Sequence, residues 1–89
     1  NKEAQIHLGI LYTNGIGVPQ DDEKALFWWK KAADQGDAIT QFNVGTMYFQ
    51  GKGTAQNYKD ALNWFEKAAQ QGHISAQVNL GIMYVNGLG

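Results

Sequence analysis

Apolar side chains recur along the chain with the spacing of α-helices. Over 2–14 the apolar residues Ala4, Leu8, Leu11 and Tyr12 fall on one face of a helix. A second segment, over 22–35, has the same periodicity, with its apolar side made of Ala25, Leu26, Trp28, Trp29, Ala32 and Ala33. The pattern therefore predicts two amphipathic helices joined by a short loop.

Residues that begin and end helices flank both segments. Gly15 follows the first segment and Gly36 the second, and glycine is common just past a helix C-terminus. Asp21 and Asp37 stand where the next helices begin, and an aspartate there can accept a hydrogen bond from a free backbone N–H. These residues support the predicted boundaries.

The whole pattern returns at an interval of 36 residues without a gap. Glycine occurs at 9, 45 and 81, and the other residues found in all three copies are Gln5, Gln41 and Gln77, Tyr12, Tyr48 and Tyr84, Gly15, Gly51 and Gly87, and Gly17, Gly53 and Gly89. A fixed period of this length is typical of stacked helix pairs. We expect helices over 2–14, 22–35, 38–50, 58–71 and 74–86, with Asn57 as an N-cap. One domain, 1–89, would hold repeat one (1–36), repeat two (37–72) and a partial repeat three (73–89).

Three of the repeated glycines, Gly9, Gly45 and Gly81, lie inside predicted helices. Glycine there costs about 1 kcal/mol relative to alanine. We expect each to let a neighbouring helix approach closely, while bulky residues of the second helices fill the interface: Trp28, Trp29, Trp64 and Phe65.

These residues resemble a Sel1-like repeat, a member of the tetratricopeptide-like superfamily. The resemblance rests on the stretches 4–12, 14–18, 22–25 and 28–36 and on their second copy. It implies an all-α fold, a right-handed α-α superhelix (solenoid) of antiparallel helix pairs. It also implies protein–protein interaction, often as an adaptor in bacterial signalling, envelope assembly or host contact, or in eukaryotic protein quality control. A cysteine-rich bacterial branch carries disulfides, and this cysteine-free chain does not fit that branch.

Charge and composition narrow the range of partners. The net charge is −1, and all seven basic residues are lysine. Because arginine usually recognises phosphate, its absence argues against nucleic acid and against an anionic membrane surface. No apolar run reaches transmembrane length and no secretory leader is present, but the chain starts at Asn1 without methionine, so we expect an excised piece. The compartment is not indicated.

No grouping of side chains predicts an enzyme, a cofactor or a metal site. The Gly-x-Gly loops lack the preceding strand and third glycine of a dinucleotide-binding motif. His7 and His73 occupy unrelated repeat positions, so a surface or interface role is expected for both. The acidic run 21–23 is explained by helix capping and the helix dipole.

A second apolar stripe on the first helices points to function. Its members are spaced i, i+4, i+7 and carry no charge: Ile6, Ile10, Thr13, Phe42, Thr46, Phe49, Val78, Ile82 and Val85. Either neighbouring helices cover this stripe, or it lines a concave groove. The second alternative predicts a groove for a protein or peptide ligand, such as one face of an amphipathic helix. Phe42 and Phe49 would be its anchors, and Asn43, Gln50 and Asn79 would contact the ligand backbone.

A structural assembly module is the alternative function. Nothing in the chain pairs with the third first-helix as its own second helix would, so we expect Leu80, Met83 and Tyr84 to be partly uncovered. Terminal repeats without polar caps tend to associate. The alternative predicts self-association through these uncapped repeat ends.

Overall fold

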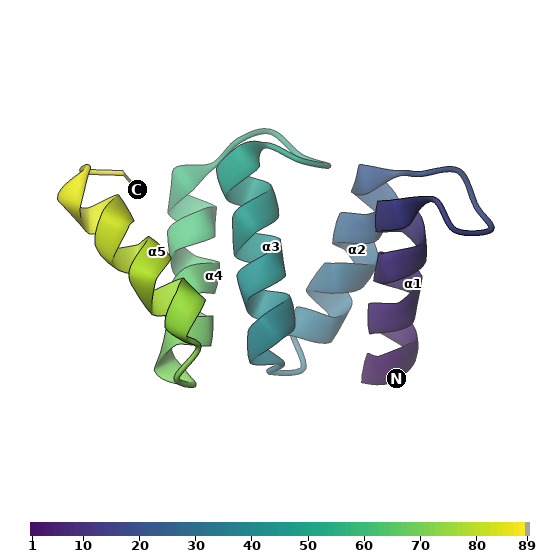
Figure 1. The fold of residues 1–89 in the computed structure, drawn as a ribbon, viewed down its shortest axis with the longest axis horizontal. Coiled ribbons are helices and arrows are strands. Elements are labelled where there is room, and N and C mark those ends of the chain that lie inside the picture. The colour runs from purple at the N-terminus through teal and green to yellow at the C-terminus, as the bar shows by residue number, and fades with distance from the viewer. Residues whose placement is uncertain (89) are drawn as a thin grey trace.

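The computed structural model describes residues 1–88. Gly89, expected to complete the Gly17 and Gly53 set, lies outside the described residues. Within 1–88 the chain forms five α-helices and no strand: α1 (Lys2–Asn14), α2 (Asp22–Ala33), α3 (Ala38–Gln50), α4 (Tyr58–Gln70) and α5 (Ile74–Val85). The helices stand side by side in chain order along the 41 Å length of the molecule, with α1 and α5 at opposite ends (Figure 1). The predicted all-α solenoid is confirmed.

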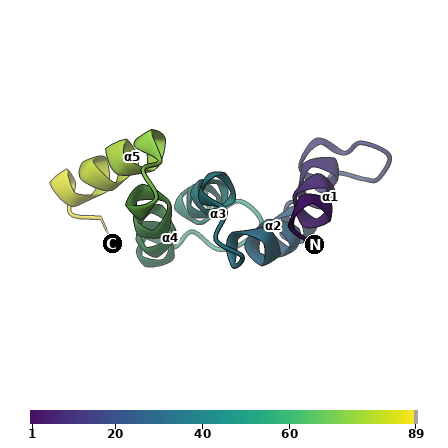
Figure 2. The same cartoon turned by 90° about the horizontal axis from the view of Figure 1, so that it is seen from below.

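The helices form two layers. Figure 2 shows α1, α3 and α5 on one side and α2 and α4 on the other. Each helix packs against the next one in sequence. Each of the five helices has 12 or 13 residues. Among residues 1–88, none reaches the length and hydrophobicity of a membrane-spanning segment.

All five helices begin where the sequence predicts, but α2, α4 and α5 end earlier than predicted. The side chains of Asp21, Asp37 and Asn57 cap their helices as expected, and Gly15 ends α1 in the left-handed conformation. The second helices were expected to run to 35 and 71 but end at Ala33 and Gln70, and α5 ends at Val85 rather than at 86. After the last residue of α2, backbone N–H groups donate to carbonyls three residues back rather than four. The chain there forms a tighter turn than an α-helix.

The core consists of two clusters that meet at α3. The first joins α2 to α3 through Ala25, Leu26, Trp29, Ala33, Val44 and Met47, and the second joins α4 to α5 through Ala61, Phe65 and Met83. Tyr48 packs against both clusters. Trp28, expected in the core, is only half-buried and meets the exposed Phe27 edge-on, with ring centroids 5.2 Å apart.

Two of the three helical glycines lie directly under an aromatic ring. A Cβ placed on Gly9 would lie 2.8 Å from the Trp29 ring, and one on Gly45 would lie 2.7 Å from the Phe65 ring. The close approach predicted for these glycines is therefore confirmed. It is wrong for Gly81, where a Cβ would meet no atom within 4 Å, because no helix follows α5 in the described chain.

The exposure predicted for the end of the array is only partly correct. Tyr84 is exposed and Leu80 half-buried, but Met83 is buried. Met83 belongs to the face of α5 that packs on α4, where it joins Phe65 and Ala61. The position of these residues at the end of the array did not show which of them face α4 and which face outward.

Asp37 ties the start of α3 to neighbouring residues. Its carboxylate accepts hydrogen bonds from the Thr40 hydroxyl and from the Thr40 backbone N–H, the latter at 2.9 Å, and lies 3.8 Å from the Lys2 ammonium. The Thr40 hydroxyl bond, helped by the Thr40 N–H and Lys2, lowers the pKa of Asp37 below its ordinary value of 3.8, against an opposing effect of burial.

Acid should weaken the fold partly through this cap. Because the folded-state pKa is depressed, Asp37 stabilises the fold above pH 3.8, and this contribution is lost as the pH falls through the folded-state pKa. Thr40→Val should lower the melting temperature at pH 7 and reduce its loss between pH 6 and pH 2. Thr46→Val is the control, because the Thr46 hydroxyl bonds the Phe42 carbonyl and no carboxylate. Equal pH dependence in wild type and Thr40→Val would contradict this account.

The same substitution at two equivalent glycines should have opposite effects. Gly45→Leu should cost about 3 kcal/mol of unfolding free energy, because its side chain would overlap the Phe65 ring. Gly81→Leu should instead stabilise by about 0.5–1 kcal/mol, since it gains helix propensity in open space. Urea unfolding followed by circular dichroism measures both values. Similar values for the two variants would disprove the difference in packing.

Candidate partner-binding groove

Two equivalent pockets lie on the layer of first helices. The first, of about 270 Å³, is formed by residues of α1, α2, α3 and the loop after α3: Thr13, Asp22, Trp29, Phe42, Asn43, Thr46, Met47, Gln50 and Lys52. The second, of about 300 Å³, is formed by residues of α3, α4 and α5: Thr46, Phe49, Gln50, Phe65, Asn79, Ile82 and Met83. Trp29, Asn43 and Met47 recur as Phe65, Asn79 and Met83, so the two pockets are repeats of one another. Thr46 and Gln50 belong to both and make the pockets adjoin.

The second pocket contains no ionisable side chain. Phe65 and Met83 are buried within it, and Ile82 is 51% exposed. Gln50 and Asn79 supply its amide groups, and Thr46 its hydroxyl. The Thr46 hydroxyl donates its proton to the Phe42 carbonyl, so the two amides supply the side-chain N–H groups of this pocket.

The first pocket adds two charged side chains to the uncharged stripe. Asp22 and Lys52 line it together with Thr13, Phe42, Asn43 and Thr46 of the stripe and its amides. Asp22 lies at the start of α2 and Lys52 in the loop after α3, so neither belongs to the first-helix stripe. Thr13 is held in place: its hydroxyl accepts the Trp29 indole N–H at 3.1 Å and donates to the Gly9 carbonyl at 2.7 Å.

The two phenylalanines expected as ligand anchors are partly used by the fold. Phe42 lies 5.6 Å from Phe65 and stacks on His73 at 4.7 Å between ring centroids. The ring centroid of Phe49 lies 5.2 Å from that of Tyr58. Both rings are half-buried against the second core cluster. Phe42 therefore lines the first pocket and Phe49 the second, while both also pack against the core.

The remaining predicted groove residues lie outside the two pockets. Ile6 is half-buried against the first core cluster. Ile10 is 38%, Val78 55% and Val85 85% exposed, on α1 and α5 at the two ends of the layer. The structure thus brings the α3 residues of the predicted stripe into the two pockets, and it leaves most of the α1 and α5 residues outside them.

Sequence reasoning missed the residues at the bottom of the pockets. Trp29 and Phe65 were assigned to the core alone, although each is both a core residue and a pocket residue. Met47 and Met83 have the same double role. Their recurrence at one repeat position was visible, but the repeat does not tell which part of a side chain reaches the surface.

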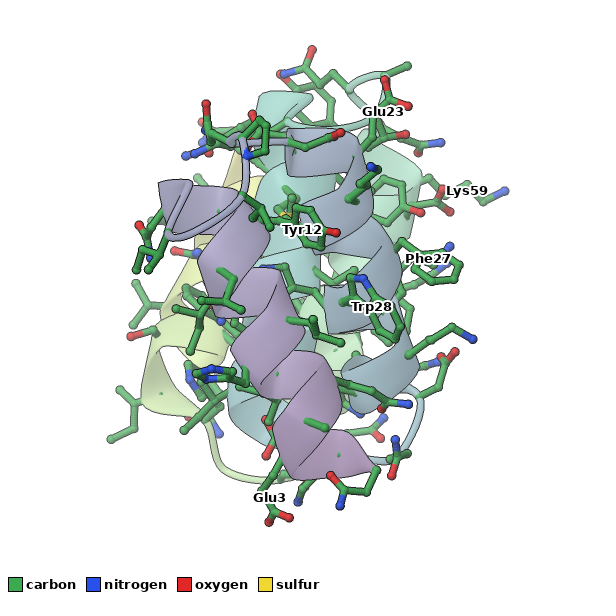
Figure 3. All side chains as sticks on the ribbon, turned by 90° about the vertical axis from the view of Figure 1, so that its right-hand side faces the viewer. Glu3, Tyr12, Glu23, Phe27, Trp28 and Lys59 are labelled. Carbon is green, nitrogen blue, oxygen red and sulfur yellow. The ribbon has the colours of Figure 1, made fainter. Side chains whose placement is uncertain are left out.

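The opposite layer carries aromatic residues whose rings lie close to lysine ammonium groups. Figure 3, which views the N-terminal end, shows Phe27, Trp28 and Lys59 on the side of the second helices, with Tyr12 between α1 and α2. The Lys31 ammonium lies 4.9 Å from the Phe27 ring, and Lys67 lies 4.5 Å from Trp64. These rings already have cationic neighbours, which makes this side less apolar than the groove.

No metal centre forms among residues 1–88, where no three His, Cys, Asp or Glu side chains gather as ligands would. His73 occupies the repeat position of Asp37 and caps α5, with its Nδ1 accepting the Ala76 N–H at 3.1 Å. Its ring therefore has a structural partner on each side, the helix end and Phe42.

Comparison with known proteins supports this architecture. The Sel1 repeat family model matches residues 2–37, 38–73 and 74–89. Among curated proteins, the Sel1-repeat-containing protein YjcO of Escherichia coli K12 is 42% identical over 31 residues, which cover 35% of this chain and 14% of that protein. The match therefore spans only a small part of the relative.

Solved structures match over nearly the whole chain. A Sel1 repeat protein from Oxalobacter formigenes has a TM-score of 0.94 and 43% identity over 100% of this chain and 37% of its own. The protective antigen c5321 of uropathogenic Escherichia coli has a TM-score of 0.93 and 41% identity over 98% of this chain and 19% of its own. Helicobacter pylori cysteine rich protein B has a TM-score of 0.83 and 33% identity over 89% of this chain and 59% of its own.

Proposed function

The chain belongs to the Sel1 repeat family, and from this premise we propose that it binds a peptide or helix of a partner protein in the groove formed by the two pockets. Sel1 repeat proteins generally act as protein-interaction scaffolds, and the family is non-catalytic. The proposal for this chain is therefore a binding function, with no cofactor and no reaction.

The repetition of one apolar pocket carries the proposal. Two adjoining pockets of similar volume, each over a second-helix aromatic ring, fit two apolar side chains of one ligand. An amphipathic helix presents such side chains at i, i+3, i+4 and i+7. The ligand side chain in the second pocket is uncharged, because no charge there would compensate its desolvation.

Polar groups fix the orientation of the ligand. The amides of Gln50 and Asn79 would bond to ligand backbone or amide groups beside the second pocket. Asp22 and Lys52 favour a polar or charged ligand residue next to the first pocket, so the ligand has one apolar and one more polar end.

Ile82 is a sharper probe of this groove than the phenylalanines. It lines the second pocket and is 51% exposed, so its replacement should leave the fold intact. Phe42→Ala and Phe49→Ala, in contrast, should lower the melting temperature as well as binding, because both rings pack in the core. Ile74 is a matched control: it lies on the same helix, is 75% exposed and lines neither pocket.

Random 16-residue peptides displayed on phage and selected on the immobilised chain provide the test. Enriched peptides should share apolar residues at helical spacing. Their synthetic forms should bind Ile82→Asp about 30-fold more weakly than wild type, as expected for a buried interface contact. Ile74→Asp should bind them as wild type does. Enriched peptides that bind Ile82→Asp with unchanged affinity would place the binding site elsewhere.

A further inference from the structure

Two charges of opposite sign lie at the first pocket, and the fold holds them there. Asp22 begins α2, and Lys52 lies in the loop after α3. The neighbour of Lys52, Gly53, packs on the backbone of Asp22 so closely that a Cβ on Gly53 would overlap the Asp22 carbonyl oxygen. The loop of the second repeat is therefore docked on the second helix of the first repeat, and this contact brings both charged residues to one pocket.

The two charges do not pair with each other. Among residues 1–88 a salt bridge joins Lys2 to Asp37, and Asp22 and Lys52 form none. The Asp22 carboxylate accepts a hydrogen bond from the Gln20 side-chain amide at 3.2 Å. A carboxylate can accept about four hydrogen bonds, and an ammonium group can donate three. The first pocket therefore offers a ligand both an anionic acceptor and a cationic donor.

The bottom of the same pocket is apolar. Trp29 and Met47 are buried there, and Phe42 also lines the pocket. The Trp29 indole N–H donates to the Thr13 hydroxyl at 3.1 Å, so this ring does not require an acceptor from the ligand. A ligand side chain that suits the whole pocket thus has an apolar stem and a polar end.

The polar end should carry no net charge. A ligand lysine or arginine would meet the Asp22 carboxylate but also the Lys52 ammonium, and a ligand glutamate would meet both with the opposite signs. Like charges across an interface are costly, and so is a charge that loses water without full compensation. A carboxamide has no net charge and carries its N–H donors and its carbonyl acceptor on separate atoms. It is therefore the side-chain group that uses both Asp22 and Lys52.

The second pocket has no such pair of charges at the equivalent positions. Thirty-six residues after Asp22 and Lys52 stand Tyr58 and Leu88. Tyr58 lies 5.2 Å from Phe49 between ring centroids, and Tyr58 and Leu88 both pack against the second core cluster. The two repeats thus differ at both positions together, so the two pockets accept different ligand residues.

We propose that the first pocket selects a glutamine of the ligand helix. The glutamine amide donates to the Asp22 carboxylate, its carbonyl accepts from the Lys52 ammonium, and its two methylene groups pack on Trp29. This inference rests on the proposed function and names the residue that the groove recognises at its first pocket. Because the two pockets adjoin, the partner helix carries this glutamine about one turn from the apolar residue in the second pocket.

The peptides selected on the wild-type groove provide the test. Enriched peptides should carry glutamine at one position of their apolar face. Synthetic forms with leucine, lysine or glutamate at that position should bind at least about fivefold more weakly, as measured by fluorescence anisotropy.

An exchange of the two pocket residues should reverse this preference. The double variant Asp22→Tyr, Lys52→Leu has the residues of the second repeat, and it should bind the leucine form more tightly than the glutamine form. Lys52→Leu alone, at an exposed loop position, should reduce the preference for glutamine without disturbing the start of α2. The matched control is Asp60→Tyr with Lys59→Leu, which removes two opposite charges at the start of α4 that line neither pocket. This control should prefer glutamine as wild type does.

Other outcomes would overturn the inference. Lysine, arginine or glutamate at the enriched position would show that the pocket uses only one of its two charges. Tighter binding of the leucine form to wild type, or an unchanged preference in the double variant, would place the glutamine outside the first pocket. Ile82→Asp tests the groove separately, because it should weaken these peptides whichever residue the first pocket prefers. A selection that yields no binding peptide would exclude both proposals.

Discussion

The contact between an aromatic ring and a helical glycine sets the geometry of this chain. Trp29 packs on Gly9, and Phe65 packs on Gly45. Any other residue in place of either glycine would hold the paired helices further apart. The same two rings form the bottoms of the two pockets, so the distance between paired helices and the shape of the groove have one cause. An 89-residue solenoid has a small core, and each of these contacts is correspondingly important.

The fold needs no covalent support for this arrangement. A protein described as cysteine-rich shares it with a TM-score of 0.83, while this chain contains no cysteine. Ring-on-glycine packing, side-chain caps on every helix and glutamine pairs between the helices supply the specific contacts instead. Among the described residues no buried side-chain polar atom lacks a hydrogen-bond partner, as is usual in protein interiors.

Periodicity and capping residues were enough to predict the five helices, and the glycine repeat was enough to predict their close packing. The sequence failed where a residue's environment depends on which neighbours are present. Gly81 has the same sequence context as Gly45, yet within residues 1–88 no ring lies over it. Met83 was expected to be uncovered and is buried, since it faces α4 rather than the end of the array. Four of the predicted groove residues lie outside the two pockets for a related reason. Ile10 lies at one end of the layer and Val78 and Val85 at the other, all outside the pockets, and the start of α2 and the loop after α3 add Asp22 and Lys52.

A double-mutant cycle between Gly45 and Phe65 tests the central claim most directly. Unfolding free energies would be measured in urea for wild type, Gly45→Ala, Phe65→Leu and the double variant. If the ring on the glycine sets the helix spacing, Gly45→Ala is destabilising beside Phe65 and close to neutral beside the flexible leucine, with a coupling of about 1 kcal/mol or more. Additive effects of the two substitutions would contradict the account and would require another cause for the position of α4 against α3.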